Sequence, residues 1–130
     1  MTALKHLMPL IALAWASYAT AQDTACEAPE MTATVIRCED LKLKTAEHAL
    51  NAAYRSLTAE LQQRGSEAHE REARALLVQA QRNWVAFREQ DCRAMVAARG
   101  EGTLRPWYYL NCMRTHAELR TKQLQTFRSD

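Results

Sequence analysis

The sequence has few residues that interrupt helices. Its 130 residues include only three glycines and three prolines. These are Gly65, Gly100 and Gly102, and Pro9, Pro29 and Pro106. No segment alternates apolar and polar side chains with the period of two that is typical of a strand. The stretches between the glycines are rich in Ala, Leu, Glu, Gln and Arg, which favour helices. We therefore predict an all-α protein.

The chain also lacks a strong excess of either charge. Lysine and arginine number 17 against 15 aspartates and glutamates, which gives a net charge of +2 at pH 7. A protein that binds nucleic acid concentrates Lys and Arg on one face. We therefore expect no nucleic-acid partner.

One apolar run stands out, over residues 7–19. A lysine and a histidine precede it and Ala19-Thr20-Ala21 ends it, an order typical of a secretory signal peptide. The run is too short for a permanent membrane span. We expect cleavage after Ala21, no stable membrane insertion, and a single domain over residues 22–130. Since Asp23-Thr24-Ala25 lacks a lipoprotein pattern before Cys26, we expect a periplasmic or secreted protein without a lipid anchor.

The four cysteines are Cys26, Cys38, Cys92 and Cys112. No two of them form a CxxC pair, which argues against a redox site or a zinc ribbon. An even number of cysteines in an exported chain predicts two disulfides.

Apolar side chains recur every three or four residues in three segments, as on one face of a helix. The first segment carries Leu43, Ala46, Leu50, Ala53/Tyr54, Leu57 and Leu61. The second runs to about Arg99 and carries Ala73, Leu77, Ala80, Trp84, Phe87 and Met95. The third carries Tyr109, Met113, Ala117, Arg120/Leu124 and Phe127.

Glycines separate these three segments. Gly65 is expected to end the first helix and Ser66 to cap the second. Residues 100–103 break the chain again, Thr103 is expected to cap the third helix, and Pro106 is tolerated in its first turn. The pattern predicts an antiparallel helical hairpin extended to a three-helix bundle.

Two disulfide pairings fit this bundle. Cys92 and Cys112 lie equally far from a bend near residue 102, which leaves Cys26 to pair with Cys38. Cys38 and Cys92 are also nearly symmetric about Gly65. We favour Cys26–Cys38 with Cys92–Cys112, although this geometry alone does not decide between the two arrangements.

The most specific string in the chain is Leu77-x-x-Ala80-Gln81-x-x-Trp84-x-x-Phe87-Arg88-x-x-x-Cys92. Together with Leu50-Asn51-x-x-Tyr54 and with Gly102-Thr103, Pro106, Tyr109, Cys112 and Arg120, it resembles the LprI-like family of small exported helical proteins, which is named for a lysozyme inhibitor. The resemblance implies a helical fold, supports the Cys92–Cys112 pairing and suggests a lysozyme as partner. Two residues depart from the family pattern, Glu101 in place of a glycine and Ala117 in place of a threonine.

Several motif residues have a structural interpretation as well as a functional one. Trp84 and Arg88 fit a ligand-binding stack, but a core tryptophan covered by an arginine that reaches Asp91 or Glu118 is the simpler interpretation. Asn51 and Tyr54 are expected to form an interhelical hydrogen bond, and Arg120 completes this structural motif.

The loop between the second and third helices is the better candidate for partner binding. The candidate residues are Arg99, Glu101, Thr103, Arg105, Trp107 and Tyr108. Loops on rigid scaffolds often carry function, and Trp, Tyr and Arg are enriched at interface hot spots. An ordinary turn whose aromatic residues belong to the core is the alternative.

Catalytic and metal-binding patterns are missing. Glu67, His69, Glu70 and Glu72 lack the second histidine of HExxH and fit a solvated helix start, where acidic groups favour the helix dipole. His48 and His116 stand without a nucleophile. We therefore expect no enzyme activity, cofactor or metal.

Two functions remain from this sequence. The first is an exported protein that inhibits lysozyme by inserting the loop into its cleft. The alternative is a periplasmic structural or interaction module that binds another envelope protein or peptidoglycan and inhibits nothing.

Overall fold

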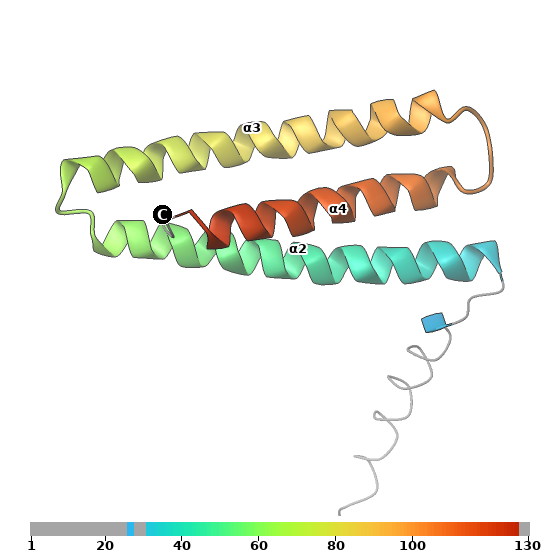
Figure 1. Ribbon diagram of the computed structural model, residues 1–130, viewed down its shortest axis with the longest axis horizontal. Helices are drawn as coiled ribbons and strands as arrows, with labels where there is room; N and C mark the ends of the chain where they lie inside the picture. The colour runs from blue at the N-terminus through green and yellow to red at the C-terminus, as the bar shows by residue number, and fades with distance from the viewer. Residues whose placement is uncertain (1–25, 28–30, 128–130) are drawn as a thin grey trace, which may run out of the picture.

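Three helices make up the fold. The computed structural model describes residues 26–27 and 31–127, and these contain α2 (Thr32–Gln63), α3 (Ala68–Ala98) and α4 (Arg105–Gln125). In Figure 1, α3 runs antiparallel to α2, and α4 returns alongside α2. No strand occurs in these described ranges, so the predicted all-α three-helix bundle is confirmed. The expected signal peptide, residues 1–21, lies outside the described residues.

None of the described helices combines the length and the apolar character that crossing a membrane requires. Instead, each helix buries one stripe of side chains against the other two. The main core cluster comprises Ala46, Leu50, Leu57, Leu61, Leu77, Ala117 and Leu124. A second cluster near the α3–α4 loop comprises Leu43, Cys92 and Met113.

The prediction of which α3 residues face the core is partly wrong. Phe87 is 57% exposed, and Ala80 is also exposed, because α3 turns Leu77, Arg88 and Cys92 toward the core instead. Neighbouring side chains in a helix point about 100° apart, so the burial of Arg88 places Phe87 at the edge of the buried face of α3. Phe127, also predicted to face inward, is 49% exposed near the end of the described chain.

The N-caps of two helices differ from the expectation, and the first helix extends beyond its apolar pattern. α2 begins at Thr32, well before the apolar pattern that starts at Leu43. The N-cap positions of α3 and α4 are held by Glu67 and Leu104 rather than Ser66 and Thr103, and neither forms a side-chain capping bond.

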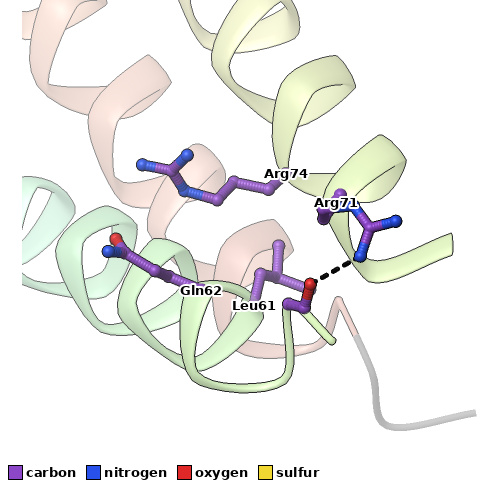
Figure 2. A pocket seen from close by; sticks show the side chains of 5 residues that line it. Leu61, Gln62, Arg71 and Arg74 are labelled. Carbon is purple, nitrogen blue, oxygen red and sulfur yellow. Dashed lines mark hydrogen bonds between the residues drawn. The ribbon is translucent and has the colours of Figure 1, made fainter. Parts of the chain in front are cut away.

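An arginine side chain supports the turn between α2 and α3, where Gly65 follows the end of α2 as predicted. Arg71 donates from Nη1 to the carbonyl oxygens of Gly65 (2.8 Å) and Ser66 (2.9 Å). Figure 2 shows the first of these two bonds as a dashed line to Arg71. The guanidinium thereby satisfies two backbone carbonyl groups of the turn.

Both favoured disulfides are present. Cys26 pairs with Cys38 and Cys92 with Cys112, and each pair of Cα atoms lies 5.6 Å apart. The alternative Cys38–Cys92 pairing is thereby excluded. The Cys92–Cys112 bond joins α3 to α4 close to the loop that connects them, so it holds that end of the bundle together.

A buried carboxylate ties α2 to α4. Glu39 is only 4% exposed, and its Oε1 accepts hydrogen bonds from Asn111 Nδ2 (3.1 Å) and Arg114 Nε (2.6 Å). Arg114 also contacts Glu118 at 2.7 Å. The hydrogen bond to Glu39, and then the one to Glu118, raises the pKa of Arg114. This network fixes α4 against α2 close to the second core cluster.

Candidate functional site

The α3–α4 loop connects the two helices at one end of the bundle (Figure 1). Gly100 (φ 75°) and Gly102 (φ 157°) have positive φ values that favour glycine. Between them, the Glu101 side chain is 98% exposed. Arg105 Nη1 donates to the Gly100 carbonyl and lies 3.8 Å from Glu101 Oε1. Arg105 therefore ties the first turn of α4 back onto the loop.

Aromatic and cationic side chains gather beside this turn. The Arg99 guanidinium carbon lies 4.2 Å from the ring centre of Tyr108, and Arg99 Nε donates to Met95 Sδ at 3.2 Å. Trp107 meets Tyr108 edge to face, with ring centres 5.3 Å apart. Thr103 is exposed. Five of the six predicted loop residues therefore make contacts in two groups, one of Arg99, Tyr108 and Trp107 and one of Glu101 and Arg105.

Two open hollows flank Arg105. One, of about 380 Å³, is lined by residues 99–105 together with Tyr108. The other, of about 390 Å³, is lined by Arg105 with Arg93, Val96, Pro106 and Tyr109. The surface at this end of the bundle is therefore concave on both sides of one arginine.

Sequence reasoning missed a hydrogen-bonded group below the loop. Tyr109 donates through its hydroxyl to Glu89, and Arg93 Nε donates to the same carboxylate at 2.6 Å. The bond from Tyr109, and then that from Arg93, lowers the pKa of Glu89. Burial, and then the bond to Glu89, raises the pKa of Tyr109. The four-residue spacing of Glu89 and Arg93 was the available sequence signal.

Trp84 and Arg88 form a separate layer between the helices. The Arg88 guanidinium lies 4.9 Å from the Trp84 ring centre, and its Nη2 donates to Glu47 Oε1 at 3.1 Å. The prediction that Arg88 reaches Asp91 or Glu118 is wrong. Asp91 contacts His116, and Glu118 contacts Arg114.

Arg120 closes the same layer from α4. Its guanidinium lies 6.0 Å from the Trp84 ring centre, and its Nε donates to Gln81 at 3.0 Å. Burial lowers the pKa of Arg120. Tyr54 packs against the main core, whereas Asn51 is exposed and makes no interhelical hydrogen bond within the described residues. These motif residues mostly join the helices.

A comparison with protein-family models decides the relationship. The model described as "Lysozyme inhibitor LprI" matches residues 23–124. The chain belongs to the LprI family. The match includes α2, α3, all of α4 except its last residue, the four cysteines and the α3–α4 loop. No curated protein and no solved structure matches the chain.

Two other clusters of this LprI-family chain are less suited to binding. Cys92, Cys112 and His116 have ligand atoms within 4.8 Å of one another, but the two sulfurs are bonded to each other and do not serve as metal ligands. The acidic start of α3 is not fully solvated as predicted, since Glu70 is only 5% exposed.

A basic hollow lies at the opposite end of the bundle from the loop. It has a volume of about 320 Å³ and is lined by Leu61, Gln62, Gly65, Arg71 and Arg74. In Figure 2 the Arg74 side chain extends away from α3, while Arg71 is bonded to the turn. Because Arg71 is already bonded to two carbonyl groups of the turn, we interpret this hollow as part of the structure of the turn and not as a binding site.

Proposed function

We propose that the protein is an exported lysozyme inhibitor that acts after removal of residues 1–21 and binds through its α3–α4 loop. The match to the lysozyme-inhibitor family over residues 23–124 is the observation that carries this proposal. Two disulfides are typical of a protein that works in an oxidising compartment, the periplasm or the exterior.

The loop suits a cleft because its form is held from within the chain. Arg105 ties it to Gly100, Arg99 lies on Tyr108, and the Cys92–Cys112 bond joins the helices that carry it. A loop that is ordered before binding loses less conformational entropy in the complex.

The chemistry of the loop also complements a lysozyme. The cleft of a lysozyme holds two carboxyl groups that act on the glycosidic bond. Arg99 and Arg105 supply positive charge, and Trp107 and Tyr108 supply aromatic surface. Because the chain has a net charge of only +2, we expect burial and shape, rather than long-range attraction, to provide most of the affinity.

The test is lysis of a cell-wall suspension by several types of lysozyme, with the oxidised protein added in increasing amounts. We expect saturable inhibition of at least one type. Trp107→Ala in the loop is expected to weaken it by about tenfold or more, as for an interface hot spot. Leu76→Ala is the matched control, because Leu76 is 63% exposed on α3 and lies outside the loop.

The outcomes separate the parts of the proposal. If both variants inhibit as well as the unmodified protein, the loop is not the contact site. If the unmodified protein inhibits no lysozyme, the inhibitor function is wrong, and an interaction module for another exported protein or peptidoglycan becomes the better account. Circular dichroism of each variant shows whether the helices are intact.

A further inference from the structure

The two arginines of the loop have different surroundings. The Arg105 side chain is 35% exposed, its Nη1 donates to the Gly100 carbonyl, and Glu101 lies 3.8 Å away. Its charge therefore has both a carbonyl and a carboxylate partner within the loop. Arg99 is exposed and makes no ion pair with any other described residue.

The contacts of Arg99 hold it in place without compensating its charge. The guanidinium lies 4.2 Å from the Tyr108 ring centre, and Nε donates a hydrogen bond to the sulfur of Met95 at 3.2 Å. Neither partner is an anion. Its two terminal nitrogens form no hydrogen bond within the described residues, so they are available to an incoming acceptor.

A carboxylate is the group that such an arrangement fits best. A guanidinium presents its terminal N–H groups as a planar fork that matches the two oxygens of a carboxylate, and packing on an aromatic ring limits its motion. Tyr108, with Trp107 against its edge, also provides an apolar wall beside the charge. This wall reduces the exposure of the pair to water, which strengthens it.

We propose that Arg99 is the residue that binds a carboxylate of the lysozyme cleft, while Arg105 is a positioning residue that shapes the loop. This inference rests on the proposed lysozyme-inhibitor function and divides the roles of the two arginines.

The experiment compares Arg99→Gln, Arg105→Gln and the control Arg82→Gln, in which an exposed arginine of α3 outside the loop is changed. The inhibition constant of each is measured against one susceptible lysozyme at several NaCl concentrations. We expect Arg99→Gln to weaken inhibition by at least about thirtyfold, the lower range for truncating a paired interfacial charge. It should also lose most of the salt dependence of the inhibition.

Arg105→Gln is expected to weaken inhibition while keeping the salt dependence, because Arg99 still meets the carboxylate. Arg99→Lys serves as a second test, since lysine keeps the charge but not the fork, and it should recover only part of the loss. The signal of the Arg105 variant in circular dichroism should remain helical.

The inference is overturned if Arg99→Gln behaves as the Arg82→Gln control, or if the salt dependence is lost in Arg105→Gln and kept in Arg99→Gln. Either result leaves the inhibitor function standing, because the unmodified protein still inhibits. Absence of inhibition by the unmodified protein toward every lysozyme instead removes the function on which the inference rests.

Discussion

Replacing Arg88 by methionine should make the protein more stable, although it removes an ion pair. Arg88 is 9% exposed, and its Nε and Nη1 are buried without a hydrogen-bond partner. Leaving a buried donor nitrogen unpaired costs about 1 to 3 kcal/mol, so two such nitrogens are a substantial penalty.

The favourable contacts of Arg88 are smaller. Its stack on Trp84 contributes roughly 1 to 2 kcal/mol. The pair with Glu47 contributes about 1 kcal/mol, because the Glu47 side chain is 38% exposed. Methionine has a similar length and packs well on an aromatic ring. We therefore expect Arg88→Met to raise the free energy of unfolding by about 1 to 3 kcal/mol.

Urea unfolding of the oxidised protein, followed by circular dichroism, measures this change. Glu47→Gln is the matched control, because it leaves the buried guanidinium without its carboxylate. It should lower the free energy of unfolding by about 1 to 2 kcal/mol. The double variant should resemble Arg88→Met alone. A loss of more than about 1 kcal/mol in Arg88→Met would show that the two N–H groups are satisfied, and the reasoning would fail.

Three further changes test other parts of the structure. Glu39→Ala removes the buried acceptor of two α4 side chains and should lower the free energy of unfolding in urea by about 2 to 4 kcal/mol; a change below about 1 kcal/mol would contradict the role of this network. Replacing Cys92 and Cys112 together by alanine should cost about 3 kcal/mol in the loop-entropy model for a separation of 20 residues, and an unchanged urea midpoint would refute this. The pKa of Glu89 is lowered in the folded state, first by the bond from Tyr109. The stabilisation by Glu89 is therefore present above the pKa of the unfolded state, about 4.3, and is lost as the pH falls through the lower pKa of the folded state. In this acid range, Glu89→Gln should make the free energy of unfolding depend less steeply on pH. An unchanged slope would contradict the assignment.

Local patterns were sufficient to predict most of the fold. Glycines occur only near residue 65 and near residue 101, and these positions correctly predicted the two turns. The spacing of Leu50, Leu57 and Leu61 correctly predicted the buried face of α2. The positions of Cys92 and Cys112 on either side of a turn fitted the observed bond, but Cys38 and Cys92 fitted a turn almost as well, and the family resemblance favoured the arrangement that the structure shows. Such features depend on neighbours within a few helical turns.

Contacts between distant residues were not predictable in this way. Glu39 is buried because its partners stand 72 and 75 positions later in the chain, and Arg88 pairs with a residue 41 positions earlier. The orientation of α3 depends on how all three helices pack. A pattern of apolar residues alone therefore placed Phe87 inside, although it lies at the margin.

The candidate site was partly predictable for the same reason. Residues 99–108 adjoin one another along the chain, so their gathering at one loop follows from the break at Gly100 and Gly102. The different surroundings of Arg99 and Arg105 could not be predicted from the sequence. They follow from contacts seen in the structure, in which Arg99 lies on the ring of Tyr108 and Arg105 donates to the carbonyl of Gly100.

Hydrogen exchange measured by mass spectrometry tests the central claim most directly. The oxidised protein is compared alone and in a mixture with each of several lysozymes. We predict that one lysozyme slows exchange at backbone amides of residues 99–108 and leaves the N-terminal third of α3, around Leu76, unchanged. Protection confined to other segments, or no protection with any lysozyme, would contradict the proposal that this loop binds a lysozyme.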